Sequence, residues 1–280
     1  MGTDPVATLP TVRIEPLRGW RSLGLHELWQ HRELVGFLAW RDIVVRYKQT
    51  VLGVAWAILQ PVLTMVVFSV FFGRLAGIPS DGVPYPVFAY TALLPWNLFA
   101  NGLTSSAGSI VGGAHLVQKV YFPRLAIPIA PLLGALFDFL IAFLVLAILM
   151  VFYGIAPTWR LVAVLPLLLL TMLTSLGAGL WLAALNVRYR DVRYALPFLV
   201  QIWLFATPIA YPTSLVPESW RTLYALNPMV GVVDGFRWAV LGVAKAPTTT
   251  LLPSAAVAMV VLVTGAFYFR RAEAEFADVV

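Results

Sequence analysis

The chain has 280 residues, of which 60% are hydrophobic and 11% are charged, with a net charge of +6 and no cysteine. A soluble domain is about half apolar and about a quarter charged, so this composition excludes an ordinary soluble protein and indicates a polytopic membrane protein. The lack of cysteine excludes a disulfide framework, a thiolate metal site and a cysteine nucleophile. The basic residues lie at the ends of apolar runs, where lipid and topology explain them, so no nucleic-acid partner is expected.

Residues 1–24 contain no apolar core of the length that a signal peptide needs, so we expect a cytosolic N-terminal tail. Residues 25–50 tolerate a helix and carry aromatic side chains suited to an interfacial depth. Apolar residues recur there at helical spacing, at Leu34, Phe37, Leu38 and Val45. The stripe is interrupted, because Arg41 falls on the same face and Ile43 on the opposite one. Both an interfacial helix on the cytosolic leaflet and an ordinary packed cytosolic helix fit this pattern.

Six apolar runs within residues 51–272 approach the length needed to cross a hydrocarbon core of about 30 Å. They are residues 51–72, 87–107, 125–153, 161–185, 195–211 and 250–269, the fifth being only just long enough. The small residues Gly177, Ala178 and Gly179 in the fourth run permit close helix contact. The sequence therefore predicts an all-α membrane protein with six transmembrane helices.

A short polar segment, at about 110–124, separates the second run from the third, and we call it the elbow. Gly112-Gly113 breaks the preceding helix, and Pro123 pushes the residue before it out of the helical region. Between them is room for two helical turns, on which His115 and Lys119 share one face. This piece could press on a soluble partner. A solvated loop whose Lys119 and Arg124 meet anionic lipid headgroups explains it equally well.

Two short amphipathic segments precede the last run, at about 217–242. They cover residues 218–226 and 229–241 and are joined by Asn227-Pro228. In the second segment Asp234 and Arg237 are three residues apart and are expected to pair. The pattern predicts a re-entrant hairpin that dips in from the outer face, with an external hairpin lying on the surface as the alternative.

The distribution of cations gives the orientation. Fourteen of the 19 Lys and Arg residues lie before the first run, in the elbow, in a second cationic loop at 186–194 and after the last run. Because cytosolic loops carry the excess of Lys and Arg, the elbow and both termini, including the tail at 273–280, are predicted to be cytosolic.

The sequence contains no phosphate-binding loop, no histidine pair with metal-ligand spacing and no Gly-x-Ser-x-Gly motif. No enzymatic activity, cofactor or metal is therefore expected in this chain. Asp138 is the one intramembrane acid, between Phe137 and Phe139. An acid at this depth needs a partner or a proton. We interpret Asp138 as a structural hydrogen-bonding or interface residue rather than a proton relay, because no ionisable companion lies in another run.

Aromatic residues gather in the outer half of the predicted spans: Phe68, Phe71, Phe72, Trp203, Phe205, Tyr211, Trp220 and Tyr224. Their faces could stack on sugar rings along a carbohydrate path. An interfacial aromatic belt is the commoner use of such residues.

Four stretches together closely resemble the permeases of polysaccharide-export ABC transporters, which include O-antigen, teichoic-acid and capsule exporters. They are RYKQTVLGVAWAILQPVLTMVVFSVFFGRL (46–75), AGIPSDGVPYPVFAYTALLPWNLFANGL (76–103), HLVQKVYFPR (115–124) and LNPMVGVVDGFRWAVLG (226–242). The resemblance covers nearly the whole chain from about Leu34 onward.

The resemblance implies a homodimer of six-span subunits in a bacterial cytoplasmic membrane, paired with two copies of a separate ATP-binding subunit that holds ATP and Mg²⁺. The dimer would move a lipid-linked polysaccharide outward. Residues 25–50 would be an interface helix and the elbow a coupling helix that meets the ATPase through His115, Leu116, Lys119, Tyr121, Phe122 and Arg124. The substrate path would include Phe68, Phe71, Phe72, Trp203, Phe205 and Tyr211. The external gate would be formed by the hairpin at 217–242 with Trp220, Tyr224, Asp234, Phe236 and Arg237.

Two other readings of the sequence stay open. One is a permease of the same architecture that moves drugs or simple lipids. The other is a secondary carrier or a membrane-embedded transferase, which would need more polar groups at depth than Asp138.

Overall fold

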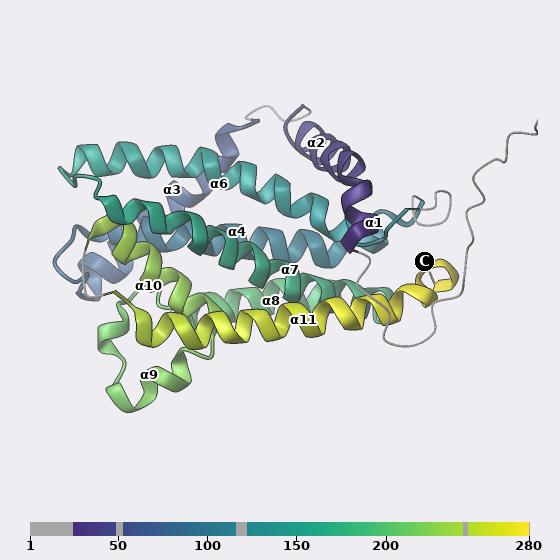
Figure 1. Ribbon diagram of the computed structural model, residues 1–280. Helices are drawn as coiled ribbons and strands as arrows, with labels where there is room; N and C mark the ends of the chain where they lie inside the picture. The colour runs from purple at the N-terminus through teal and green to yellow at the C-terminus, as the bar shows by residue number, and fades with distance from the viewer. Residues whose placement is uncertain (1–24, 49–52, 116–121, 243–245, 280) are drawn as a thin grey trace, which may run out of the picture.

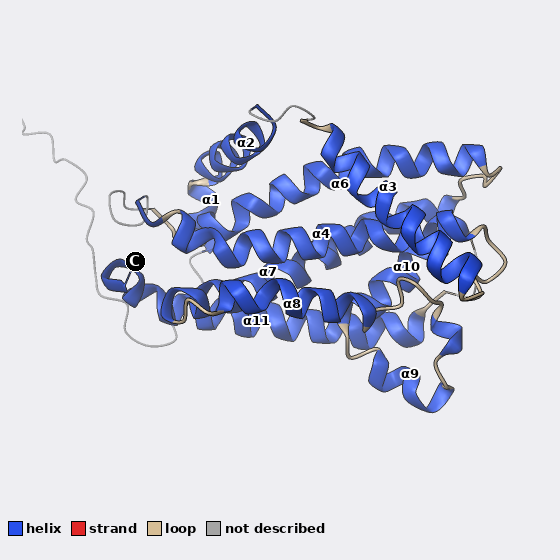
Figure 2. Ribbon diagram, turned by 180° about the vertical axis from the view of Figure 1, so that it is seen from behind, coloured by secondary structure: helices blue, strands red, loops and turns tan. Residues whose placement is uncertain are grey.

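The computed structural model describes residues 25–48, 53–115, 122–242 and 246–279, and every regular element in these ranges is helical (Figures 1 and 2). The α-helices are α1 (Leu25–Gln30), α2 (Arg32–Lys48), α3 (Ala55–Phe68), α4 (Tyr85–Gly112), α6 (Ala126–Phe152), α7 (Val164–Arg188), α8 (Val192–Phe205), α9 (Glu218–Tyr224), α10 (Pro228–Leu241) and α11 (Thr248–Val279). A π-helix, η1 (Ser69–Leu75), continues α3, and two 3₁₀-helices, η2 (Trp159–Ala163) and η3 (Thr213–Leu215), precede α7 and α9.

The longer helices run back and forth along the length of the bundle, among them α4, α6, α7 and α11 (Figure 1). Helix α4 lies at the centre and packs against α3, α6, α7, α8 and α10. Helices α1 and α2 lie toward the end of the bundle that holds the C-terminus, whereas α9 and α10 lie at the opposite end (Figures 1 and 2). The bundle therefore has one end with α1, α2 and the described parts of the elbow, and another with the α9–α10 hairpin.

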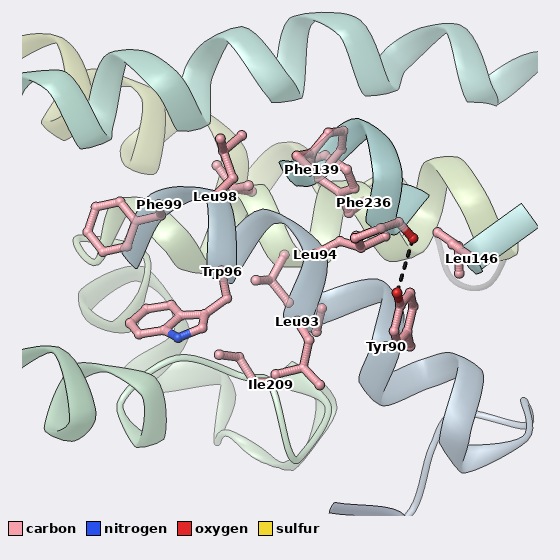
Figure 3. Close-up of a cluster of buried hydrophobic side chains, with 14 of the residues drawn as sticks. Tyr90, Leu93, Leu94, Trp96, Leu98, Phe99, Phe139, Leu146, Ile209 and Phe236 are labelled. Atoms are coloured by element: carbon pink, nitrogen blue, oxygen red, sulfur yellow. Dashed lines mark hydrogen bonds between the residues drawn. The ribbon is translucent and has the colours of Figure 1, made fainter. Parts of the chain in front are cut away.

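The core forms around the buried side of α4. Trp96, Phe99 and Tyr90 are fully buried there, and the Tyr90 hydroxyl donates a hydrogen bond of 3.1 Å to the carbonyl oxygen of Ala142 in α6 (Figure 3). The rings of Phe139 from α6 and Phe236 from α10 meet edge to face, with centroids 6.1 Å apart. The predicted gate residue Phe236 thus belongs to the core, which ties α10 to the bundle.

Within the described residues, four helical segments are long and apolar enough to cross a membrane: Ala55–Leu75, Ala126–Phe152, Trp159–Arg188 and Thr248–Ala274. They correspond to the first, third, fourth and sixth predicted spans. Helix α4 is long enough, but asparagine, serine and threonine lower its hydropathy. Helix α8 has 14 residues, shorter than the fifth span predicted at 195–211, because the chain leaves the helix after Phe205.

Helix boundaries follow the predicted turn signals. Helix α4 ends at Gly112 with Gly113 as its C-cap, as the Gly-Gly pair predicts. Helix α10 begins at Pro228, after the side chain of Asn227 accepts a hydrogen bond of 3.0 Å from the Met229 backbone N–H. It ends at Leu241, and the C-cap residue Gly242 has a φ of +67°, which favours glycine.

Helix α2 has two apolar faces. Val35, Leu38 and Ala39 are buried, in a cluster with residues of α6 and α11, while Phe37 and Trp40 are exposed on the opposite side. The mixed stripe predicted for residues 25–50 has this cause, since one apolar face packs on protein and the other faces outward. The arrangement combines features of both sequence interpretations.

Helix α11 continues past the span predicted at 250–269 and ends at Val279. Phe269 and Phe276 are buried against each other in the same cluster as α2, with ring centroids 5.2 Å apart. The segment after residue 272 is therefore a helical extension that packs on the bundle rather than an extended tail.

Candidate functional site

The elbow is described in part. Leu116, Lys119 and Tyr121 lie outside the described residues, so their predicted place on a coupling helix stays a prediction. His115 is exposed at the start of the elbow. Phe122 at its end is buried in the cluster with α2 and α11.

A small polar network anchors the end of the elbow to α11. The guanidinium of Arg124 donates a hydrogen bond to the backbone carbonyl oxygen of Glu273. The Glu273 carboxylate lies 2.5 Å from Arg270, whose guanidinium also lies 3.9 Å from the carboxylate of Glu27 in α1. The end of the elbow is therefore linked directly to α11, and α11 is in turn linked to α1.

Asp138 meets the C-terminal end of α2. Its carboxylate lies 2.5 Å from the Arg46 guanidinium and accepts a hydrogen bond from the Tyr47 hydroxyl. Burial, and then the hydrogen bond to Asp138, raise the pKa of the Tyr47 phenol, so it stays a proton donor. These contacts are of the kind that the predicted structural hydrogen-bonding role of Asp138 requires. We expected no ionisable companion in another apolar run, and the partner that the structure shows, Arg46, comes from α2 and not from a span.

Replacement of Asp138 with alanine is expected to loosen α2, because Arg46 and Tyr47 then lose their acceptor. We expect a destabilisation of about 1 to 2 kcal/mol, since Arg46 is partly exposed and water screens the pair. Protease cleavage near residue 48 should become faster. Asp42→Ala is the matched control, because Asp42 is bonded to its neighbour Arg41 within α2. Equal cleavage of the two variants would contradict this role.

Arg237, which was predicted to belong to the gate, is buried and links α10 to the segment that follows α8. Its guanidinium donates hydrogen bonds to the carbonyl oxygens of Pro208 at 2.6 Å, Ile209 at 2.8 Å and Tyr211 at 3.4 Å. It also lies 3.5 Å from the centroid of the Phe88 ring in α4. The carbonyls are free to accept because helix α8 has ended at Phe205.

Asp234, one turn before Arg237, has different partners. Its carboxylate accepts hydrogen bonds from the hydroxyls of Thr213 at 2.6 Å and Thr250 at 3.3 Å. None of the ion pairs between described residues joins Asp234 to Arg237. The two side chains therefore form no contact ion pair, because the carbonyls beyond α8 hold the guanidinium, although the two charges still interact at longer range.

The other two predicted gate residues, Trp220 and Tyr224, form part of the wall of an open cavity of about 510 Å³ between the end of α8 and the α9–α10 hairpin. Trp203, Trp220, Tyr224 and Asn227 line it, and the Trp203 indole donates a hydrogen bond of 2.9 Å to the Asn227 side chain. The hydroxyl of Tyr224 lies 2.9 Å from that of Tyr211. The hairpin is thus held to the bundle by a few specific polar contacts.

The predicted aromatic path is divided between two places. Phe68 is buried and meets Phe72 edge to face on α3 and η1, while Phe71 is exposed. On α8, Trp203 packs on the core and Phe205 is exposed. None of the residues that line the hairpin cavity comes from α3 or η1. A single path through all of these residues stays a prediction.

A second cavity, of about 410 Å³, lies where the end of α2 meets α3, α4 and α6. Arg46, Tyr47 and Asp138 form part of its wall. Amide and hydroxyl side chains of α3 and α4 form much of the rest: Gln60, Asn97, Asn101, Thr104 and Ser105. In the described part of the chain, no group of three or more His, Asp or Glu residues could hold a metal ion. Amides and hydroxyls both donate and accept, so the polar groups of the cavity are suited to hydrogen bonding.

Comparison with known proteins gives the family. A family model described as ABC-2 type transporter matches residues 33–241, which run from α2 through α10 and include both cavities. The chain belongs to the ABC-2 type transporter family. The family resemblance predicted from the sequence is thereby confirmed, and the apolar helices agree with a multi-pass membrane protein of this family.

Several named proteins resemble this ABC-2 family chain over most of their length. The O-antigen export system permease protein RfbA of Myxococcus xanthus is 33% identical over 259 residues, which cover 91% of this chain and 98% of the relative. A protein of the same name from Klebsiella pneumoniae is 27% identical over 198 residues, covering 70% and 76% of the two chains. The polysialic acid transport protein KpsM of Escherichia coli is 27% identical over 206 residues, covering 72% and 78%.

Sequence reasoning missed the polar side of α4 in this ABC-2 transporter chain. Asn97, Asn101, Thr104 and Ser105 recur at intervals of four, three and one residues, which places them on one face of a helix. The signal was present but was hidden by the mean hydropathy of the run. Arg46 and Tyr47 gave no such local signal, because their partner Asp138 is about 90 residues away.

Proposed function

We propose that this chain is the permease subunit of an ATP-driven exporter that moves a lipid-linked polysaccharide from the cytosolic leaflet outward. The observation that carries the proposal is the near full-length match to an O-antigen export permease, at 33% identity over 91% of this chain. Relatives named for O-antigen export and for polysialic acid transport share a polysaccharide as cargo. The substrate class is therefore a bacterial surface glycan, such as an O-antigen, a capsule or a teichoic acid.

In this proposal α4 and α8 complete a set of six spans in the cytoplasmic membrane. Helix α4 tolerates its polar residues because many of its side chains are buried inside the bundle or face a cavity. The elbow and both termini lie in the cytosol, in agreement with the charge bias. The α9–α10 hairpin then lies at the outer face as a re-entrant gate.

The permease acts as a homodimer paired with two ATP-binding subunits, which hold the ATP and Mg²⁺. The apolar faces of α3 and α8 support a seam between two copies. Along α3 the exposed side chains outside the cavity lining include Ile58, Leu59 and Val66, and along α8 they include Phe198 and Ile202. Lipid covers whatever part of these faces the second copy leaves open.

The energy of ATP hydrolysis reaches the span helices through the elbow. Helices α4 and α6 meet there, and Arg124 joins it to α11. Because α4 contacts α3, α8 and α10, a shift of the elbow can bias both the seam and the hairpin. Different contacts in two states, rather than chemistry in this chain, give the direction of transport.

Co-purification with the ATP-binding subunit encoded beside this chain tests the proposal. We expect a stable complex with ATPase activity, and a pairing weakened about tenfold by a His115→Ala/Lys119→Ala variant, which truncates two elbow side chains. Arg74→Ala is the control, since Arg74 is exposed on η1, away from the elbow. A chain that pairs with no ATPase, or whose deletion leaves the surface polysaccharide intact, would rule out the exporter.

A further inference from the structure

Five polar side chains in the cavity beside α2 have no hydrogen-bond partner among the residues that the structure describes. Within the described ranges, the side chains of Gln60, Asn97, Asn101, Thr104 and Ser105 form no hydrogen bond. Other hydroxyls of α4 are satisfied: Ser106 donates to the carbonyl oxygen of Pro128 at 2.7 Å. The five unpaired groups are therefore confined to the face of α3 and α4 that borders the cavity.

An unpaired amide is costly inside a membrane. A polar side chain there faces the protein interior, a water-filled space or a ligand, because hydrocarbon offers no hydrogen bond. Asn101 and Thr104 are exposed, and Asn97 is half-buried, so these groups can reach a molecule that enters the cavity. The cavity lies within the range of about 300 to 1,000 Å³ that is usual for small-molecule sites.

The charges of the cavity decide between a phosphate and a neutral ligand. Arg46 is its cation, and the Asp138 carboxylate, 2.5 Å away, already balances that charge. A phosphate bound to the guanidinium would therefore lie beside the negative charge of Asp138. Amides and hydroxyls, in contrast, both donate and accept, which suits the hydroxyl groups of a sugar. The Trp56 side chain at the wall offers an aromatic face to the apolar side of a ring.

We propose that this cavity is a binding subsite for neutral sugar residues, in which Asn97 and Asn101 hydrogen-bond to sugar hydroxyls. The inference rests on the proposed export function and adds the residues that hold the glycan on the elbow side of the bundle. The site differs from the aromatic path predicted from the sequence, because its contacts are polar and come from α3, α4 and α6. It places sugar recognition before the outer hairpin.

A single thiol in the cavity tests the site. The chain has no cysteine, so Ser105→Cys gives one reactive position there. The full-length chain with its ATP-binding partner is reconstituted in nanodiscs and treated with a charged thiol reagent. The probe is a neutral oligosaccharide released by mild acid from the surface polysaccharide of the source cells. We expect the oligosaccharide to slow labelling, and Asn97→Leu/Asn101→Leu to raise its half-protection concentration about tenfold or more.

Three controls make the result specific. Ser109→Cys lies one turn further along α4 and outside the cavity, so the oligosaccharide should leave its labelling rate unchanged. Inorganic phosphate should give no protection of Ser105→Cys. If the double leucine variant does not fold, Thr104→Val replaces it, with Thr64→Val as its match, because Thr64 bonds within its own helix.

Three results would overturn the inference: no protection by the oligosaccharide, equal protection by phosphate, or an unchanged half-protection concentration in the cavity variants. A measurement of the surface glycan on cells distinguishes a failure of this inference from a failure of the proposed function. If the wild-type gene restores the glycan to a deletion strain and Asn97→Leu/Asn101→Leu restores it equally fast, the subsite is wrong and the export function stands. If the wild-type gene restores nothing, both fail.

Discussion

Gly177→Ala is expected to destabilise the protein strongly, because α7 and α11 cross in contact at this residue. A methyl group on Gly177 would lie 2.6 Å from the Cα atom of Leu262 and 2.7 Å from its nitrogen. Backbone atoms cannot turn aside as a side chain can, so the helices must separate. We expect a loss of about 3 kcal/mol or more in the free energy of unfolding. The measurement is the melting temperature of the detergent-solubilised chain, which should fall by about 10 °C.

Gly265→Ala tests the same crossing from the other helix. A methyl group there would contact the carbonyl oxygen of Gly177 and would lie 2.9 Å from the Trp181 ring. Gly108→Ala is the control, because no atom lies within 4 Å of the added methyl group on α4. That variant should gain roughly 0.5 to 1 kcal/mol, since alanine loses less entropy than glycine in a helix. If Gly177→Ala and Gly108→Ala have the same melting temperature, the close crossing does not contribute to stability.

This crossing shows what a sequence can and cannot predict about packing. The small residues at Gly177 and Gly179 predicted a close helix contact, and the structure confirms it. They did not identify the partners. Gly177 lies against Leu262 and Gly265 of α11, whereas Gly179 faces Ser106 of α4. Small residues allow a close approach to any helix, and the topology selects which one.

Hydropathy predicted the strongly apolar spans because nearly every residue in each of them is apolar. It overestimated the length of α8, since the apolar run continues to Tyr211 while the helix ends at Phe205. It also hid the cavity side of α4, because an average over a span loses a pattern that repeats every three or four residues. The polar face of α4 that lines the cavity could therefore have been predicted from the spacing of its residues, but not from the mean hydropathy of the run.

Long-range polar contacts were the least predictable part of the candidate sites. Asp138 bonds to Arg46 and Tyr47 of α2, and Asp234 bonds to Thr213 and Thr250 on either side of α10 in the chain. No periodicity links such residues. Their meeting depends on how α2 and α10 dock on the bundle, which is decided by burial of apolar surface elsewhere.

Replacement of Arg237 with methionine is expected to be as damaging as the glycine changes. Methionine keeps apolar bulk near Phe88 but leaves the carbonyl oxygens of Pro208 and Ile209 without their donor. A buried polar group without a partner costs about 1 to 3 kcal/mol, so two of them give a loss of about 2 to 6 kcal/mol. The measurement is again the melting temperature in detergent, together with the yield of monodisperse protein.

The lysine variant shows which property of Arg237 matters. Arg237→Lys keeps the charge but replaces a planar fork, whose two terminal nitrogens reach two different carbonyls, with a single ammonium. We therefore expect Arg237→Lys to lose nearly as much stability as Arg237→Met. The control is Arg74→Met, at an exposed position on η1, which should change the stability little. Recovery of full stability by lysine would mean that charge alone holds α10, through Asp234. Loss in both variants means that the planar guanidinium holds the end of α8 and the hairpin together, so the hairpin is fixed by hydrogen bonds to backbone carbonyls rather than by an ion pair.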